Sequence, residues 1–490
     1  MRWRNIIFKW RPLLLIVAVI YTILIIPSWF SSSLDETKDE PRLAQGVNPK
    51  LKLGRKSSNN SKLTIDHSAE LMKIKPETEA PKKLINVKPD LKPSAQLETN
   101  NEQPEMVVAS EKFVFKLNYR GQSLAIEEVL THPDMPKLKE RVTFSPDLAK
   151  SNRTKILIWD SGFGQQNLGG CPEWNCEVIS GAGNLASADV VVIQSPSFTI
   201  KKEPHQLFVY YSQESPRNSA SLGQGPPGYF NTMFGFRHDT VGGSPYGYTV
   251  KLAPESRRTG EIVDKKLVMG KSKGATWFVS HCSTQSHREE YVRELQKYFQ
   301  VDIYGQCGTM RCAKGDNCEN SVDKDYHFYM ALENSICQDY ITEKLWNQGY
   351  SHTVVPIVLK RSLVEAYVPP KSFIAFDDFE TVQEMADYLK HLMENKTEYM
   401  SYFDWRKDYE VIYLNGLAHD ELEKPWGFCQ LCRLSHLKDS ATKYTIQNLS
   451  KFWDQSCDPD GKLVSEILAK SRAKGNSPTQ VVNNSTQVKN

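Results

Sequence analysis

The chain has 490 residues, more than one ordinary domain, so two globular domains with additional segments are expected. Its 61 basic and 58 acidic side chains leave a net charge of +3. This near-balance predicts no strong electrostatic attraction to nucleic acid or to a strongly acidic partner. The first predicted element in the chain is 12–30, which contains no charged residue. At about 1.5 Å per residue this run spans roughly 29 Å, close to one hydrocarbon core.

Basic residues precede this apolar run but do not follow it until Lys38; they are Arg2, Arg4, Lys9 and Arg11. The positive-inside bias therefore predicts a cytoplasmic tail at 1–11, a transmembrane signal-anchor at 12–30 and a lumenal remainder. The expected topology is single-pass type II. A signal peptide cleaved near 31–33 is the alternative.

The next segment, 31–112, contains no Phe, Trp, Tyr or Cys. Such a composition cannot bury enough apolar surface to offset its ordering entropy, so a disordered lumenal stem is predicted. All ten cysteines lie between Cys171 and Cys457, and in a lumenal domain they are expected to form disulfides. Zinc binding by the Cys429-x-x-Cys432 pair, or by the cluster of Cys307, Cys312 and Cys318, is the alternative.

Between 113 and 460, short apolar runs alternate with helical patterns. Strands are predicted at 155–159, 189–194, 207–213, 275–280, 301–304, 327–332, 353–359 and 373–376, and helices at 287–299, 339–350 and 381–395. This alternation favours parallel sheets covered by helices, in two Rossmann-like domains at 113–265 and 266–460. The remainder, 461–490, is predicted to be a polar tail with a helix at 464–474.

Ligands of open α/β sheets bind beyond the carboxyl ends of the strands. This rule selects Glu214, the segment 280–288 and the segment 333–344. In the third position we expect Asp339 to cap a helix whose second turn carries Lys344. The positive end of the helix dipole makes a cation there unfavourable unless a phosphate binds beside it. The same argument applies to Arg288, near the start of the predicted helix 287–299. The alternatives are that Lys344 pairs with a carboxylate and that Glu214 is solvated.

Two Asp-x-Asp pairs could hold a divalent ion with a nucleotide sugar: Asp323 with Asp325, and Asp458 with Asp460. The first pair precedes a predicted strand, at the wrong end for a ligand, and the second lies in a Pro-containing turn. No metal site is therefore predicted. Stimulation by Mn²⁺ or Mg²⁺ stays open.

Several segments resemble the α1,3-fucosyltransferase family. The main one is LENSICQDYITEKLWNQGYSHTVVPIVL (332–359), followed by YVPPKSFIAFDDF, with YYSQESPRN and WFVSHCSTQSHREEY upstream. The resemblance implies a GT-B fold, in which two Rossmann-like domains face a cleft, the acceptor side being 113–265 and the GDP-fucose side 266–460. It places the general base on Glu214. It places donor contacts on Arg288, Tyr329, Asn334, Tyr340, Glu343 and Lys344, with Arg288 and Lys344 at the diphosphate.

The activity implied is inverting transfer of L-fucose from GDP-β-L-fucose, in α1,3 linkage, to GlcNAc of N-glycans, with no required cofactor. The Cys-rich segment 308–320 and GFCQLCRLSH (427–436) resemble the invertebrate and plant branch, which modifies the innermost (core) GlcNAc. A Lewis-type enzyme that acts on antennal GlcNAc, or a non-catalytic lumenal glycan-binding protein, is the alternative. The expected location is the Golgi membrane, through the N-terminal anchor.

Overall fold

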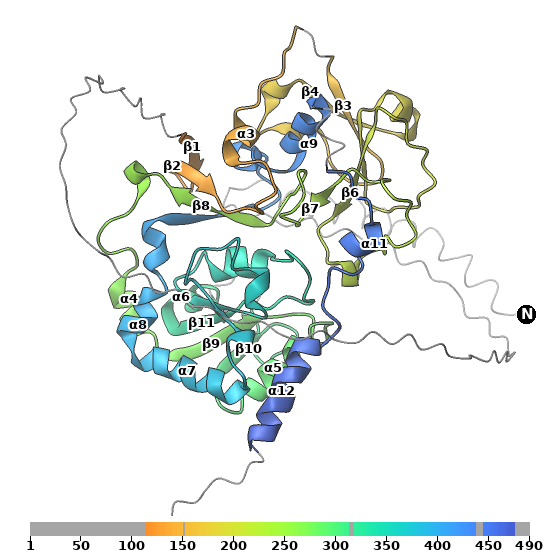
Figure 1. Ribbon diagram of the computed structural model, residues 1–490. Helices are drawn as coiled ribbons and strands as arrows, with labels where there is room; N and C mark the ends of the chain where they lie inside the picture. Colours follow the sequence, from red (N-terminus) through yellow and green to blue (C-terminus); the bar gives the residue numbers. More distant parts are fainter. Residues whose placement is uncertain (1–112, 150–151, 313–317, 438–443, 476–490) are drawn as a thin grey trace, which may run out of the picture. The chain divides into compact units, whose positions relative to one another are not determined.

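The computed structural model describes residues 113–149, 152–312, 318–437 and 444–475 (Figure 1). The predicted anchor at 12–30 and stem at 31–112 lie outside these residues. Within the described part, no helix has the length and apolarity needed to cross a membrane. The described chain forms two parallel sheets of five strands each and one antiparallel sheet of four strands. The predicted α/β class with parallel sheets is therefore confirmed.

The first parallel sheet has the strand order β4-β3-β5-β6-β7. Its strands are β3 (Thr154–Ile158), β4 (Cys176–Ser180), β5 (Val190–Ile193), β6 (Leu207–Ser212) and β7 (Thr232–Gly235). Ile156 and Ile158 enter one hydrophobic core, while Leu157 between them enters another. Both faces are thus covered, which explains why the strands are continuously apolar. β4 and β7 were not predicted, since CEVIS and TMFG contain polar residues or glycine.

The second parallel sheet has the order β10-β9-β11-β12-β13. Its strands are β9 (Lys273–Phe278), β10 (Val301–Tyr304), β11 (Tyr326–Met330), β12 (Val355–Val358) and β13 (Ile374–Ala375). Helices α5 (Arg288–Leu295) and α7 (Val382–Glu394) share one core with Phe328 and Met330. The π-helix Lys344–Gly349 packs on the other face, against Tyr329 and Ala331. Shorter helices are α3 (Leu138–Val142), α4 (Lys265–Gly270), α6 (Asn320–Asp325) and α8 (Lys396–Ser401).

The antiparallel sheet was not predicted. Its order is β1-β2-β8-β14, from β1 (Phe115–Tyr119), β2 (Gln122–Val129), β8 (Gly247–Leu252) and β14 (Tyr409–Tyr413). β8 pairs with β14, with Val250 opposite Glu410. This pairing joins a strand from the predicted first domain to a strand from the predicted second domain. A division of the chain at 265 therefore does not separate two independent sets of elements.

The chain also returns to the first sheet near its C-terminus. Helix α9 (Gly427–His436) buries Phe428, Leu431 and Leu434 in the same core as Ile156. Two disulfides, Cys171–Cys429 and Cys176–Cys432, fix this helix to the loop between β3 and β4 and to the start of β4. The predicted disulfides are confirmed for all ten cysteines, the other pairs being Cys282–Cys307, Cys312–Cys318 and Cys337–Cys457. Helix α11 (Leu449–Phe452) adds Leu449 to the other core of this sheet.

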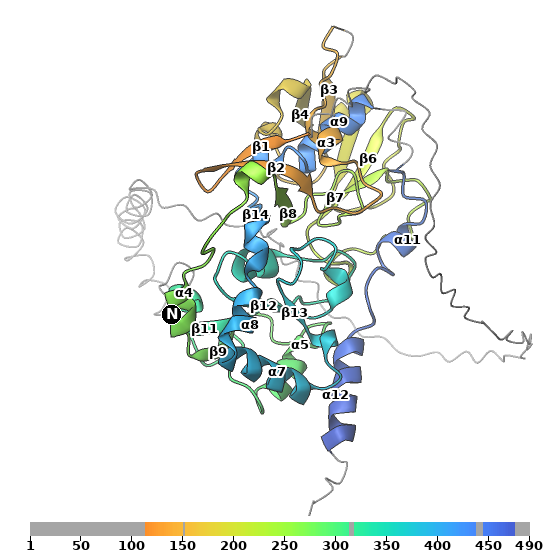
Figure 2. The same cartoon turned by 60° about the vertical axis from the view of Figure 1, so that its left-hand side comes forward.

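Helix α12 (Lys462–Gly475) confirms the predicted helix at 464–474, but its packing corrects the prediction that 461–490 is a polar tail. Val464, Ile467 and Leu468 are buried in the core of the second sheet. Figure 2 shows α12 beside α5 and α7, and the helix contacts both. The apolar residues recur at i, i+3 and i+4, so one stripe of an otherwise charged helix packs against the core.

We expect Ile467→Ala to lower the free energy of unfolding by about 2–5 kcal/mol, because it removes buried methyl groups and leaves a cavity. Chemical denaturation of the protein measures this difference. Lys470→Ala, at an exposed position of the same helix, is the control and should change the stability little. Equal stability of the two variants would show that α12 is not part of the core.

Candidate active site

The loop that follows β11 meets the loop that follows β6. Ser335 donates a hydrogen bond to Ser215 over 2.7 Å, and both hydroxyls are buried. Beside this contact, the Tyr340 hydroxyl donates to the Glu214 carboxylate over 3.2 Å. The structure thus brings Glu214, from the carboxyl end of one parallel sheet, to Tyr340, from the carboxyl end of the other. This is the position where an open α/β sheet binds its ligands.

Glu214 is held by its backbone and free to act with its side chain. The Ser212 hydroxyl accepts from the Glu214 N–H over 3.2 Å and donates to the Glu214 carbonyl over 2.9 Å. The residue is exposed, so water or an acceptor hydroxyl can reach the carboxylate. Asp239 is different, because Arg237 donates to its two oxygens over 2.9 and 2.5 Å. Of these two carboxylates, Glu214 is therefore the better candidate for a general base.

Lys344 lies between two carboxylates. Its amino group is 3.1 Å from Glu333 and 3.0 Å from Glu343. Burial lowers the pKa of Lys344, but the two carboxylates outweigh this and raise it, so the amine is charged. Burial acts to raise the pKa of Glu343, but the charge of Lys344 more than offsets this effect, so the pKa of Glu343 is lowered. The pairing with a carboxylate that was the alternative for Lys344 is therefore present in the structure.

The predicted helix at 339–350 is wrong in its start and its form. The π-helix begins at Lys344, and Asp339 does not cap it. Instead Asp339 has a φ of +59° and its carboxylate accepts the His238 N–H over 3.0 Å. Glu333 accepts the N–H and the hydroxyl of Thr342 over 2.7 and 2.9 Å. The carboxylate of Asp339 thus binds the loop that contains His238. Glu333, and not Asp339, accepts the N–H of Thr342 next to the start of the π-helix.

Arg288 begins helix α5, as predicted, but it is buried with an exposed fraction of 3%. Its guanidinium donates to the carbonyls of Leu332 and His281 and lies over the Trp277 ring at 5.4 Å. Its Nε atom has no hydrogen-bond partner among the described residues. Burial lowers the pKa of Arg288, and Glu333 partly offsets this effect. In this structure Arg288 therefore ties together the loops that follow β9 and β11.

The other two predicted donor contacts lie next to the cluster of Arg288, Glu333, Glu343 and Lys344. Asn334 accepts from the Ser335 hydroxyl over 3.0 Å, and its carbonyl accepts the Ser286 N–H over 2.9 Å. Tyr329 is 2% exposed in the core beneath the π-helix. Burial raises the pKa of its phenol, on which the charges of Glu343 and Arg288 act in opposite directions. Tyr329 therefore lies within electrostatic range of both residues.

Comparison with known proteins agrees with this arrangement. The model described as "Glycosyltransferase family 10 (fucosyltransferase) C-term" matches 268–453, and "Fucosyltransferase, N-terminal" matches 151–247. An α-(1,3)-fucosyltransferase of Caenorhabditis elegans, fut-1, is 53% identical over 359 residues, which cover 73% of this chain and 82% of that protein. The chain belongs to glycosyltransferase family 10, the fucosyltransferases. The predicted resemblance is confirmed.

Two further similarities were found for this fucosyltransferase. The α-(1,3)-fucosyltransferase C of Drosophila melanogaster is 32% identical, covering 61% of this chain and 75% of that protein. A crystal structure of an α1,3-fucosyltransferase with GDP-fucose is 16% identical, with a TM-score of 0.39, covering 63% of this chain and 96% of that chain.

Aspartates of both Asp-x-Asp pairs of the fucosyltransferase contact basic side chains. Asp323 is 2.7 Å from His352 and precedes β11, at the end of the sheet opposite the cluster. Asp458 accepts from Lys360 over 2.7 Å, and Asp460 lies 3.3 Å from Arg217. Among the described residues, the group with metal-ligand spacing is Cys176, Cys432 and His436. Because its two cysteines form a disulfide, the zinc interpretation of Cys429-x-x-Cys432 is wrong.

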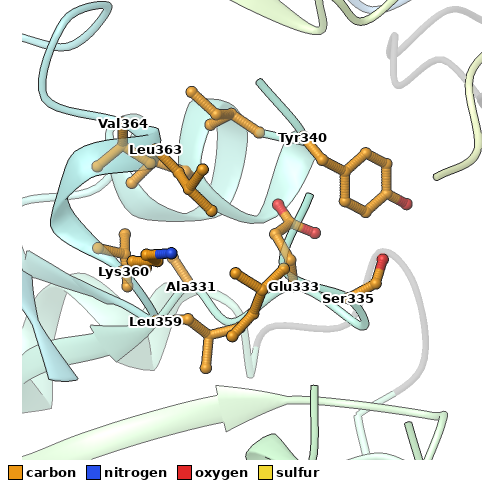
Figure 3. Close-up of a pocket in the computed structure, with 12 residues that line it drawn as sticks. Ala331, Glu333, Ser335, Tyr340, Leu359, Lys360, Leu363 and Val364 are labelled. Atoms are coloured by element: carbon orange, nitrogen blue, oxygen red, sulfur yellow. The ribbon is translucent and has the colours of Figure 1, made fainter. Parts of the chain in front are cut away.

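A pocket of about 330 Å³, including space open to solvent, lies beside the cluster (Figure 3). Figure 3 shows the polar ends of Glu333, Ser335 and Tyr340 toward one side of it. Lys360 also lines it. Sequence reasoning assigned no role to Glu333 or Lys360, although each directly follows a predicted strand. The rule on strand ends already selected Glu333, as the first residue of 333–344, and the same rule could have found Lys360.

His238 gives this fucosyltransferase a pH-dependent stability. Its ring is fully buried, stacks on Tyr367 at 4.0 Å, and has no partner on either nitrogen among the described residues. Burial lowers its pKa to about 3, helped by Arg141 and His132 and opposed by Asp239. A histidine that is neutral when folded contributes its full stability above the unfolded pKa of 6.5, and loses it as the pH falls.

From pH 7 to pH 5 this one group should cost about 2 kcal/mol of unfolding free energy. His238→Phe keeps the stacked ring and removes the titration, so we expect a smaller loss by about that amount. Urea denaturation of the two proteins at both pH values measures it. The same pH dependence in wild type and variant would mean that folding does not lower the pKa of His238.

Proposed function

We propose that the protein is an inverting α1,3-fucosyltransferase that transfers L-fucose from GDP-β-L-fucose to GlcNAc of N-glycans, most specifically the innermost GlcNAc. The observation that carries the proposal is the 3.2 Å contact between Tyr340 and Glu214. It joins the base predicted in the first half to the donor-binding segment predicted in the second half. The names of similar proteins support the linkage and the acceptor class, among them the glycoprotein 3-α-L-fucosyltransferase A of Drosophila melanogaster, 29% identical over 336 residues.

In the proposed reaction Glu214 accepts the proton of the acceptor hydroxyl while that oxygen attacks the anomeric carbon. GDP leaves from the opposite face, and the configuration inverts. The sugar carries oxocarbenium-like charge at that moment, and the leaving diphosphate gains negative charge. Lys344 is the cation proposed to stabilise this charge, with Arg288 holding the loop behind it. Asn334, Tyr329, Tyr340 and Glu343 would orient the nucleotide sugar between two Rossmann-like halves of GT-B type.

We infer that the enzyme acts in the Golgi lumen, anchored by 12–30. The five disulfides support an oxidising compartment. The proposed acceptor is found on glycoproteins of the same compartment.

Incubation with GDP-fucose and a panel of N-glycopeptides tests the proposal. The panel contains one glycan with an unmodified innermost GlcNAc and one with galactosylated antennae. Mass spectrometry with linkage analysis should find fucose α1,3-linked to the innermost GlcNAc. Fucose on the antenna would favour a Lewis-type enzyme. Binding of the glycopeptides without transfer would favour a glycan-binding protein.

We expect transfer to persist in excess EDTA, with at most partial loss, since Asp323, Asp458 and Asp460 are each already paired. The rate of fucosyl transfer with and without the chelator measures this. Added Mn²⁺ or Mg²⁺ should stimulate only modestly. Complete loss that a metal ion restores would mean that a required ion is held elsewhere in the protein.

A further inference from the structure

Lys360 stands at the carboxyl end of β12, the neighbour of β11 in the second sheet. It lines the pocket that Glu333, Ser335 and Tyr340 also line. Figure 3 shows its amino group turned inward from the side of the pocket opposite Tyr340. The same edge of the sheet carries the loop with the predicted donor contacts. Lys360 is therefore a third cation, besides Arg288 and Lys344, at the edge where the nucleotide sugar is proposed to bind.

The three cations differ in what holds them. Arg288 is buried, and its hydrogen bonds go to backbone carbonyls. Lys344 is paired with two carboxylates, one of which, Glu333, is largely buried. Lys360 instead donates to Asp458 over 2.7 Å, and the two side chains are 28% and 33% exposed. Lys360 has one carboxylate partner where Lys344 has two, so Lys360 is the cation that can change partner at the least cost.

Asp458 itself is fixed. The adjacent Cys457 forms a disulfide with Cys337 in the loop after β11. The Asp458 N–H donates to the Ile336 carbonyl over 2.8 Å, and the Asp458 carbonyl accepts from Arg217 over 3.0 Å. The carboxylate is thus held on a rigid segment, while the lysine has a flexible four-carbon stem. Any exchange of partners moves Lys360 and leaves Asp458 in place.

We propose that Lys360 is a further donor-binding residue, which exchanges Asp458 for the diphosphate of the nucleotide sugar. The inference rests on the proposed function, since it takes GDP-fucose as the donor. A diphosphate carries more negative charge than one carboxylate and offers several acceptor oxygens, so it can draw the ammonium from Asp458. Asp458 competes with the ligand for Lys360.

Calorimetric titration of the lumenal enzyme with GDP and, separately, with guanosine tests the proposal. Lys360→Met should weaken GDP binding about tenfold or more and leave guanosine binding unchanged, because guanosine has no phosphate. Asp458→Asn should tighten GDP binding about two- to fivefold by removing the competitor. Lys390→Met, on the outer face of α7, is the control and should bind GDP like the wild type. Lys360→Gln replaces Lys360→Met if the latter does not fold.

Unchanged GDP affinity in Lys360→Met overturns the inference, and so does an equal loss for GDP and guanosine. If the wild type binds neither compound, the proposed function fails instead. Weaker GDP binding in Asp458→Asn would also contradict the exchange, because it would show that Asp458 assists the ligand.

Discussion

Glu214→Gln is expected to lower the turnover of fucosyl transfer by about 10²–10⁴-fold, the usual contribution of a positioned general base. Glutamine keeps the shape of the side chain and can accept the hydrogen bond from Tyr340, but it cannot take the acceptor proton at neutral pH. Because Glu214 lies on the first half, the affinity for GDP should change little. Initial rates at saturating GDP-fucose and acceptor, together with GDP titration, separate the two effects.

Glu255→Gln, at an exposed position of the same half, is the matched control and should keep normal turnover. Asp239→Asn gives a second comparison. It disturbs the ion pair with the buried Arg237, so a reduced rate there should be accompanied by reduced stability. Near-normal turnover of a folded Glu214→Gln enzyme would show that another group is the base.

Lys344→Met should weaken GDP binding by about 10- to 100-fold, the value of one lost charge-assisted hydrogen bond, and slow transfer as well. It should also destabilise the protein by up to about 3 kcal/mol, because Glu333 then keeps a buried carboxylate with no cation beside it. Burial already raises the pKa of Glu333, so the carboxyl group can take up a proton and limit this cost. Thermal unfolding and GDP titration measure the two quantities.

The double variant Lys344→Met/Glu333→Gln distinguishes the two roles of Lys344. Glutamine is neutral and can still accept the Thr342 N–H, so the stability should return. GDP affinity should not, because the cation is still missing. Recovery of GDP affinity in the double variant would mean that Lys344 acts only by neutralising Glu333.

The parallel sheets were largely predictable because their central strands are buried on both faces and have continuous apolar sequences, as in β5 (Val190–Ile193). The antiparallel sheet was not. Its strands come from three distant stretches, and β1 alternates exposed and buried residues in only five positions. The burial of helix α12 in the core was not predicted, because its three buried residues lie among charged ones in the sequence.

In the candidate site, the resemblance supplied Glu214 and Tyr340 separately. Their contact depends on how two sheets are placed, which no local pattern contains. Pairing of Lys344 with a carboxylate was the alternative, but Glu333 was not named as its partner, because a carboxylate beside that cation would repel the phosphate expected there. Only the hydrogen bonds from Thr342 show why that carboxylate is retained.

Helix α9 has a consequence for the order in which the protein can be made. It completes the core of the first sheet from 258 residues further along the chain than Cys171. At about 5–20 residues per second, the ribosome needs roughly 13–50 s to cover that distance. Through that interval the nascent chain exposes the apolar side of β3 and two unpaired thiols to its surroundings. The core of the first sheet can therefore be completed only after α9 has been synthesised. Until then its apolar surface is open to aggregation and its two thiols to incorrect pairing.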